Sequence, residues 1–438
     1  MYKRKIEKLL EDWKSTPAHK PLVIKGCRQC GKTSSVVDFA HKNYEHVVYL
    51  DFHENAQLCA IFDGSLQVDY LVMAITAMVP NSRFVPGATC LVLDEIQDCP
   101  KARGALKFFS LDGRYDVICT GSLLGVNGYV GTGATIPVGF ETIVEMCPMD
   151  FEEWLWANGI QPEVVALLQQ CMSDEAPVPE AIHNRMRELL LQYVIVGGMP
   201  AVVSTFLSTH DVGQTVAMQR AIVEEYKADM VKYAHPADKA RIRECFESIP
   251  RQLSRDNKKF TYSVVRKSGR SSQYVSSLQW IEDAGIVRRC HNLTITELPL
   301  GGNAIPDSFK IYMADTGLFV SMLDEGTQSD ILQGRLYGYK GAIFENLMAD
   351  ILGKMGRKLY YYQKVDSIEI DFVIRYKGEC VPIECKAVNG NAKSMRTLLN
   401  HPEKYHVSHA LKFGDYNIGR NGSLLTLPMY MAFLVTEL

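Results

Sequence analysis

An eight-residue, glycine-bearing segment near the N-terminus constrains the fold of this chain more than any other feature of its sequence. The segment, Gly26-Cys27-Arg28-Gln29-Cys30-Gly31-Lys32-Thr33, fits the pattern G-x-x-x-x-G-K-[ST]. It directly follows an apolar run that predicts a strand, PLVIKG, and precedes a stretch compatible with a helix. A loop of this kind turns its backbone N–H groups inward around phosphate oxygens, and the helix N-terminus adds a favourable dipole. The segment therefore predicts a phosphate-binding loop.

The roles expected in and around this loop follow from the chemistry of phosphates. The Lys32 ammonium reaches the β- and γ-phosphates, and the Thr33 hydroxyl holds Mg²⁺. A second apolar run, TCLVLDE, ends in Asp94 and Glu95. There Asp94 is the expected magnesium carboxylate, and Glu95 the catalytic base that polarises an attacking water. The residues predicted to contact the nucleotide are Gly26, Cys27, Arg28, Gln29, Cys30, Gly31, Lys32, Thr33, Ser34 and Ser122.

Four apolar runs, at residues 21–26, 46–52, 89–95 and 115–122, alternate with helix-compatible stretches. Strands that alternate with helices predict a parallel sheet. The last run ends in Thr120-Gly121-Ser122, which either presents a hydroxyl to the γ-phosphate as a sensor or forms a plain strand-to-loop turn. The N-terminal part of the chain therefore predicts a P-loop NTPase domain.

Several motifs along the chain resemble those of one family and occur in the same order. They are the loop at 26–33, LDEIQ, TGS, PVGF followed by PMDFEEW, GGMP at 197–200 and YMADTGL at 312–318. These motifs are similar to those of AAA-type P-loop ATPases that carry a C-terminal domain of unknown function, DUF4143. The resemblance implies a cytoplasmic protein that binds ATP at the loop and hydrolyses it there. One position departs from the family, because Phe140 stands where an arginine is often found, and no arginine finger is assigned.

The pattern predicts an α/β multidomain protein. Residues 1–148 are expected to form the ATPase domain with its parallel sheet, and residues 149–238 a helical lid. Residues 239–300 show helix, turn, helix and a strand-like IVRRC, which is the order of a winged helix. Residues 301–438 are expected to form a restriction-endonuclease-like α/β domain. The GGMP motif predicts a helix end followed by a tight turn.

Cationic residues concentrate between Lys239 and Arg270, where ten lysines and arginines accompany only three carboxylates. Cations around a winged helix would neutralise DNA phosphates, and polar residues at the start of its second helix would approach DNA groups. These polar residues are Ser271, Ser272, Gln273 and Tyr274. The alternative is a winged helix that packs against protein and keeps a solvated basic face. Both interpretations stay open.

A hairpin is predicted at Lys377-Gly378, a dipeptide that suits a two-residue turn. Counting outward from the turn places Asp371 opposite Glu384, with both carboxylates on one face of the hairpin. Lys386 points to the same face. A divalent cation would offset the repulsion between two such carboxylates, and the adjacent ammonium would assist a metal-bound water.

Together with Glu345 on a preceding helix, GAIFENLMADIL, the hairpin resembles the PD-(D/E)xK nuclease core. The resemblance implies that Asp371, Glu384 and Lys386 are catalytic and that Glu345, Asp371 and Glu384 are metal ligands. The leading Pro-Asp pair is absent, since Ile370 precedes Asp371. Two alternatives stay open: a site that binds metal without cleaving, and a degenerate nuclease fold whose polar face has a structural or binding use.

Composition adds limits. The chain has 438 residues, of which 47% are hydrophobic, and its longest apolar stretches fall short of the ~20 residues that span a bilayer. We therefore expect a cytoplasmic protein with no membrane partner. The ligands expected from the loop and Asp94 are ATP and Mg²⁺. One hypothesis is an ATPase whose nucleotide state repositions the winged helix and the nuclease-like domain on DNA. The other is a nucleotide-gated interaction switch with an inactive nuclease-like domain, and it implies a protein partner or a second copy of the chain.

Overall fold

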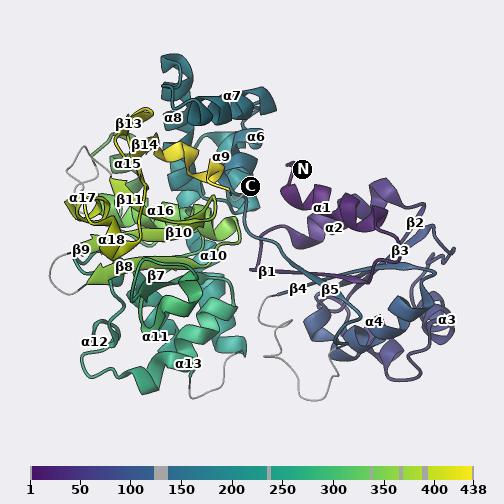
Figure 1. The fold of residues 1–438 in the computed structure, drawn as a ribbon. Helices are drawn as coiled ribbons and strands as arrows, with labels where there is room; N and C mark the ends of the chain where they lie inside the picture. The colour runs from purple at the N-terminus through teal and green to yellow at the C-terminus, as the bar shows by residue number, and fades with distance from the viewer. Residues whose placement is uncertain are drawn as a thin grey trace. The chain divides into compact units, whose positions relative to one another are not determined.

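The computed structural model describes residues 2–122, 137–233, 238–335, 339–364, 368–386 and 393–436. The chain divides into two units. The first comprises Met1–Pro148 with Asp283–Gly285, and the second comprises Met149–Glu282 with Ile286–Leu438. In Figure 1 the first unit runs from purple to blue and the second from teal to yellow. The further boundaries expected at residues 238 and 300 stay predictions.

A five-stranded parallel sheet forms the centre of the first unit. Its strand order is β2-β3-β4-β1-β5, and every neighbouring pair is parallel. The strands are β1 (Leu22–Gly26), β2 (His46–Asp51), β3 (Thr89–Asp94), β4 (Asp116–Ser122) and β5 (Thr142–Glu145). The first four are the strands that the sequence predicts, and their parallel arrangement is confirmed. In a parallel sheet the carboxyl ends of all strands lie at one edge, where ligands bind.

Helices cover both faces of this sheet (Figure 1). On one face, α1 (Lys5–Ser15) and α2 (Lys32–Asn43) bury an apolar cluster that includes Trp13, Ile24 and Val36. The opposite face is covered by η1 (Ala56–Phe62), α3 (Val68–Met78), η2 (Ile96–Asp98) and α4 (Pro100–Asp112). Because both faces are covered, β3 is buried along its whole length, as its unbroken apolar run predicts.

The second unit combines helices with two sheets. One sheet has the order β7-β6-β8-β9 and the other has the order β10-β11-β12-β14-β13. The strands are β6 (Val287–Leu293), β7 (Ala304–Met313), β8 (Leu359–Lys364), β9 (Ile368–Ile370), β10 (Phe372–Tyr376), β11 (Glu379–Lys386), β12 (Ala410–Gly414), β13 (Gly419–Asn421) and β14 (Leu424–Pro428). Since β6 pairs with both β7 and β8, the first of these sheets extends across the boundary expected at residue 300.

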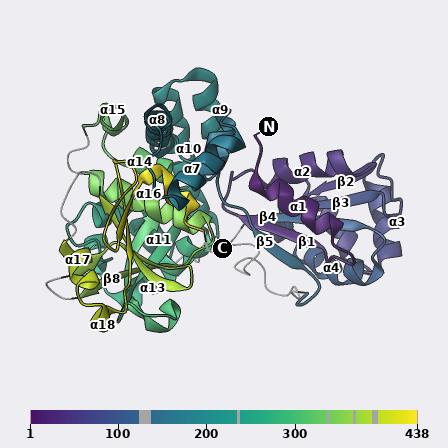
Figure 2. The ribbon, with the colours of Figure 1, turned by 45° about the horizontal axis from the view of Figure 1, so that its top comes forward.

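The helices of the second unit surround these sheets. They are α6 (Phe151–Ala157), α7 (Pro162–Ser173), α8 (Glu180–Val196), α9 (Pro200–Thr209), α10 (Val212–Tyr233), α11 (Lys239–Leu253), α12 (Tyr262–Val265), α13 (Ser271–Asp283), α14 (Thr316–Ser321), α15 (Thr327–Leu332), α16 (Lys340–Lys354), α17 (Lys393–Leu399) and α18 (Pro402–Tyr405), with η3 (Leu300–Asn303) and η4 (Met429–Leu434). Within this unit α14 and α16 lie side by side (Figure 2). None of the helices described is both long and apolar enough to cross a membrane.

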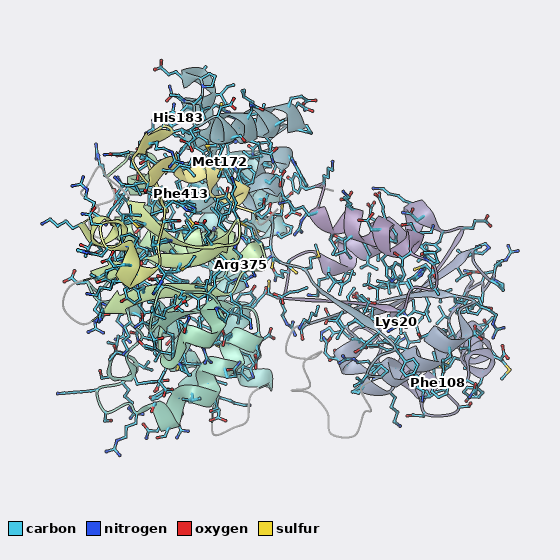
Figure 3. The ribbon with its side chains drawn as sticks, in the orientation of Figure 1. Lys20, Phe108, Met172, His183, Arg375 and Phe413 are labelled. Atoms are coloured by element: carbon cyan, nitrogen blue, oxygen red, sulfur yellow. The ribbon has the colours of Figure 1, made fainter. Side chains whose placement is uncertain are left out.

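Side chains from distant parts of the sequence meet inside the second unit. His183 on α8 is hydrogen-bonded to the Tyr430 hydroxyl at 2.8 Å, and Phe413 on β12 is fully buried (Figure 3). Helix α8 therefore packs against the C-terminal segment that contains Tyr430.

Two glycine-bearing motifs form a close backbone joint between α8, α9 and α14. Gly197, with φ of 71°, ends α8, and α9 begins at Pro200, so GGMP ends a helix as its glycines predict. The Gly198 N–H donates to Asp315 Oδ2 at 2.7 Å, and the Met149 N–H donates to the Gly198 carbonyl at 2.7 Å. A Cβ on Gly198 would lie 1.9 Å from the Met149 carbonyl oxygen. The joint therefore requires glycine for packing.

The close packing at Gly198 predicts how a methyl group added there changes the stability of the protein. We expect Gly198→Ala to lower the free energy of unfolding by about 3 kcal/mol, because backbone atoms must move to admit the Cβ. The matched control is Gly419→Ala on β13, where a Cβ would meet no atom within 4 Å. Urea unfolding of both variants checks this, and equal midpoints would contradict the close joint.

Candidate functional site

The loop between β1 and α2 closes around the side chain of Lys32. Gln29 and Gly31 adopt positive φ angles of 61° and 96°, and α2 begins at Lys32. The Lys32 ammonium is only 6% exposed and donates to the carbonyls of Gly26 at 3.2 Å and Cys27 at 3.0 Å. The cation therefore lies inside the loop at the N-terminus of α2, which is where the sequence predicts phosphate binding.

Arg4 binds the backbone of this loop from outside, a role that no local sequence pattern indicates. Its guanidinium donates to the carbonyls of Cys30 at 2.9 Å and Cys147 at 2.7 Å. Gly26 allows the close approach of the next segment, because a Cβ there would lie 2.3 Å from the Met146 carbonyl oxygen. Arg4 directly precedes α1, and nothing in the local sequence distinguishes it from the neighbouring cations, so only the fold identifies this role.

Asp94, at the end of β3, gathers hydroxyl donors from three other elements. Its Oδ1 accepts from Thr33 at 3.0 Å and from Thr120, and its Oδ2 accepts from the Tyr49 hydroxyl at 2.7 Å. The carboxylate is 3% exposed. The predicted pair of Thr33 and Asp94 is therefore brought together, and Tyr49 and Thr120 are additions that the sequence did not single out as partners of Asp94.

Glu95 follows Asp94 in a strained backbone conformation. Its φ is 52°, a left-handed value that non-glycine residues adopt rarely and at a cost in conformational energy. Its carboxylate accepts a hydrogen bond from the Gln97 amide, whose oxygen in turn accepts from the Ser122 N–H at 3.2 Å. Gln97 therefore links the predicted base to the end of β4, where Ser122 lies.

In the second unit the predicted hairpin has the predicted register. Tyr376 pairs with Glu379, and Lys377 and Gly378 have positive φ angles of 50° and 80°, as a two-residue type I′ turn requires. The ladder continues to Phe372 and ends there. Asp371 lies one residue beyond, where the chain leaves the sheet of β9 and enters that of β10.

Because the ladder ends at Phe372, the expected facing of Asp371 and Glu384 stays a prediction. The Asp371 Oδ2 accepts a hydrogen bond from the Cys385 N–H at 2.8 Å. Glu384 itself is 5% exposed, and its Oε1 lies 2.7 Å from the Lys386 ammonium. The other Glu384 oxygen, Oε2, is buried without a hydrogen-bond partner.

Glu345 on α16 is surrounded by cations that the sequence did not indicate. Lys258 lies 2.5 Å from one carboxylate oxygen, and Lys310, fully buried on β7, lies 3.6 Å from the other. The Tyr312 hydroxyl donates to the same carboxylate at 3.0 Å. Burial alone would raise the pKa of Glu345, but the two lysines hold it below its ordinary value.

The positive and negative charges around Asp371, between β9 and β10, are nearly balanced. The carboxylates are Glu345, Glu369, Asp371 and Glu384, and the ammonium groups are Lys258, Lys310 and Lys386. Burial and the nearby Glu345 raise the pKa of Asp371 to about 7, against the effects of Lys310 and Lys386. Within the described residues, no three His, Cys, Asp or Glu side chains form a group that could hold a metal ion. The metal roles of Glu345, Asp371 and Glu384 therefore stay predictions.

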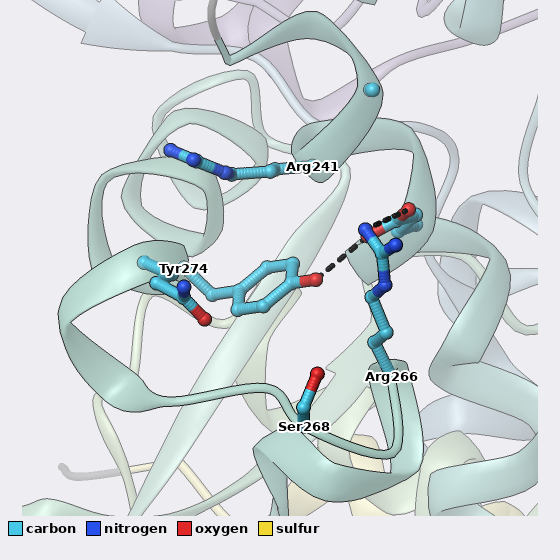
Figure 4. Close-up of a pocket in the computed structure, with 7 residues that line it drawn as sticks. Arg241, Arg266, Ser268 and Tyr274 are labelled. Atoms are coloured by element: carbon cyan, nitrogen blue, oxygen red, sulfur yellow. Dashed lines mark hydrogen bonds and ion pairs between the residues drawn. The ribbon is translucent and has the colours of Figure 1, made fainter.

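A polar pocket of about 310 Å³ lies between α11 and α13 (Figure 4). Arg241, Arg266 and Gln273 contribute to its lining, and so does Tyr274, whose hydroxyl donates to Glu244 at 2.7 Å. Lys258 of the basic region has an acidic partner from outside it, Glu345, and Arg243 pairs with Glu247 inside it. The basic excess seen in the sequence is therefore partly neutralised by the fold.

Comparison with known families divides the chain into three matched segments. Residues 18–155 match the AAA domain family, and residues 340–430 match a domain of unknown function, DUF4143. Residues 187–329 match another domain of unknown function, DUF8612. No curated protein matches the chain.

Among solved structures, the fold is similar to that of a Walker-type ATPase of Pyrococcus abyssi, with 14% identity and a TM-score of 0.44 over 74% of this chain and 96% of that one. It is also similar to the ORC2 protein of Aeropyrum pernix in ADPNP–ADP complexes, with 13% identity and a TM-score of 0.36 over 76% of this chain and 93% of that one. The AAA domain match therefore falls largely on the first unit, which contains the parallel sheet and the loop, and the DUF4143 match falls on the second unit.

The buried lysines around Glu345 lead to a stability prediction with a defined pH dependence. We expect Lys310→Met to lower the free energy of unfolding by about 3–5 kcal/mol near neutral pH, because Glu345 and Glu369 lose a buried counter-charge. A carboxylate whose pKa is depressed in the folded state stabilises it above its unfolded pKa, and this contribution is lost as the pH falls. The difference between wild type and variant should therefore shrink on acidification.

Urea unfolding of both proteins at neutral pH and at pH values below the unfolded pKa of glutamate, about 4.3, measures this difference. The exposed Lys393→Met substitution on α17 is the control and should change stability little at either pH. A Lys310→Met difference that stays constant with pH would contradict the electrostatic explanation.

Proposed function

We propose that the first unit hydrolyses ATP at the loop of residues 26–33. One observation supports this above the others: Thr33 at the end of the loop and Asp94 at the end of β3 are 3.0 Å apart, with Lys32 inside the loop and Glu95 adjacent. Thr33 and Asp94 would hold Mg²⁺, which when bound offsets the charge of the phosphates. Their hydroxyl and carboxylate oxygens suit that ion.

Residues of the loop and of the ends of β3 and β4 would bind the phosphates and accept the proton of the attacking water. The Lys32 ammonium exchanges its two loop carbonyls for phosphate oxygens, and the backbone N–H groups of the loop bind the phosphates. Glu95 accepts a proton from the attacking water, and the Gln97 amide orients the Glu95 carboxylate for this role. Ser122, whose backbone contacts Gln97, would contact the γ-phosphate through its hydroxyl.

Two substitutions separate binding from hydrolysis. We expect Lys32→Ala to abolish ATP turnover and weaken nucleotide binding, since it removes the charge that meets the phosphates. Glu95→Gln should keep nucleotide binding and lower the rate of phosphate release by about 10²-fold or more. The control is Lys101→Ala, which removes an exposed cation paired with Asp63.

Phosphate release and the binding of a fluorescent ATP analogue measure these effects. Unchanged turnover in Lys32→Ala would overturn the assignment of the site.

We further propose that the nucleotide state controls how the second unit acts on DNA. The order of α11, α12, α13 and β6, with β7 antiparallel to β6, supports a winged helix. The pocket beside α13 presents Arg241 and Arg266, whose side chains are 44% and 69% exposed and suited to phosphates. The unpartnered Glu384 oxygen and the nearby Asp371 support a cation site of the nuclease type.

A different observation favours the second candidate function, the nucleotide-gated interaction switch. Lys258 and Lys310 already neutralise Glu345, which the nuclease resemblance assigns to a metal ion. A divalent ion at Glu345 would have to displace two ammonium groups, one of them fully buried. In this version the second unit keeps a nuclease-like shape, binds its partner in an ATP-dependent manner and does not cleave.

DNA cleavage distinguishes the two candidates. Labelled single- and double-stranded DNA is incubated with Mg²⁺ or Mn²⁺, with and without ATP. If the second unit is a nuclease, we expect cleavage that Asp371→Ala abolishes and that the exposed Asp307→Ala leaves unchanged. No cleavage under any condition would contradict the nuclease and favour the switch.

A further inference from the structure

The two cysteines of the phosphate loop lie at the two ends of one turn. Cys27 and Cys30 flank Arg28 and Gln29, and the ends of a four-residue turn have Cα atoms within about 7 Å of each other. A disulfide requires Cα atoms about 4.4–6.8 Å apart. Both residues are buried free thiols, and the Cys30 Sγ lies 3.3 Å from the Met146 carbonyl oxygen, to which it donates. The turn therefore holds the two Cα atoms at about the separation that a disulfide requires.

The surroundings of the pair favour reaction at Cys30. The hydrogen bond from the Cys27 thiol lowers the pKa of Cys30 to about 6, against the effect of burial and with help from the Lys32 ammonium. The same hydrogen bond and burial raise the pKa of Cys27 well above its ordinary value. A thiolate beside a thiol is the arrangement from which disulfides form.

We propose that Cys27 and Cys30 form a reversible disulfide that switches off nucleotide binding at the loop. This inference rests on the proposed function, because it concerns regulation of the same site. With a hydroperoxide as the oxidant, the Cys30 thiolate attacks one peroxide oxygen, the O–O bond breaks, and Cys30 becomes a sulfenic acid. The Cys27 sulfur then attacks the Cys30 sulfur, the S–S bond forms, and the hydroxyl leaves as water. With hydrogen peroxide, two thiols are oxidised and one peroxide is reduced to two waters.

The bond would fix the loop in a shape that excludes phosphates. Disulfide sulfurs are about 2.05 Å apart, well below hydrogen-bonding distance, so the ends of the turn are drawn together. The Cys27 carbonyl already accepts from Lys32, and the Cys30 carbonyl accepts from Arg4. A closed turn would hold Lys32 against its carbonyls and prevent the loop N–H groups from rearranging around a ligand.

Nucleotide and oxidation should oppose each other in both directions. Bound phosphates compete with the Cys30 sulfur for the Lys32 ammonium, which lowers the fraction of Cys30 that is present as the reactive thiolate. By linkage, if the disulfide weakens ATP binding, then ATP must disfavour the disulfide by the same factor. Excess ATP is therefore expected to protect the pair.

The first unit contains a matched control pair. Cys59 and Cys99 also have neighbouring thiols, but burial and the contact with Cys59 raise the pKa of Cys99 far above its ordinary value. Neither residue belongs to the loop or to the groups around Asp94. The double variant Cys59→Ser/Cys99→Ser should therefore keep the full response of the wild type to peroxide.

The test uses the full chain treated with hydrogen peroxide, blocked with an alkylating reagent and mapped by peptide mass spectrometry. We expect a Cys27–Cys30 bond and a loss of affinity for a fluorescent ATP analogue of about tenfold or more, reversed by dithiothreitol. Excess ATP should slow formation of the bond. In Cys30→Ser, the affinities before and after peroxide should be equal.

Three results would overturn the inference. They are a Cys27–Cys30 bond without a change in affinity, a failure of this bond to form, and a bond from either residue to Cys147 instead. In each case the reduced chain would still bind the analogue, so the proposed function would stand. If the reduced chain does not bind the analogue, the proposed function fails and the inference fails with it.

Discussion

The common edge formed by the carboxyl ends of parallel strands is the constraint on which the first unit depends. In the order β2-β3-β4-β1-β5, strand β4 separates the strand of the loop from the strand of Asp94. Thr120 near the end of β4 therefore reaches Asp94, while Thr33 reaches it from the start of α2. Each of these residues is held in place by its own strand or helix.

In the second unit the corresponding constraint is the passage of one chain segment between two sheets. Asp371 is the single residue between β9 and β10, which belong to different sheets. This position brings its carboxylate near Glu345 from α16 and Lys310 from β7. Carboxylates and ammonium groups from several elements then share one poorly solvated volume, and the stability of each ion depends on the others.

Much of both units was predictable where the information is local. The parallel strands follow from apolar runs, and the register of the C-terminal hairpin follows from Lys377-Gly378, because a two-residue turn fixes which residues face each other. What lay beyond prediction depends on tertiary contacts. Lys258 is 87 residues from Glu345, and nothing in either local pattern indicates the ion pair. The same holds for Arg4, whose guanidinium bonds a carbonyl 143 residues away.

The two acidic sites differ in how their charge is compensated, and this difference indicates where a cation is needed. The hydrogen bonds described for Asp94 come from three neutral hydroxyls, on Thr33, Tyr49 and Thr120. Hydroxyl donors stabilise a carboxylate but leave its charge in place, so a divalent ion gains the full attraction of Asp94. Glu345 already faces two ammonium groups. A divalent ion at Glu345 would have to compete with these lysines, so its net gain in electrostatic energy would be smaller. Electrostatics therefore favours Asp94 over Glu345 as the ligand of a cation.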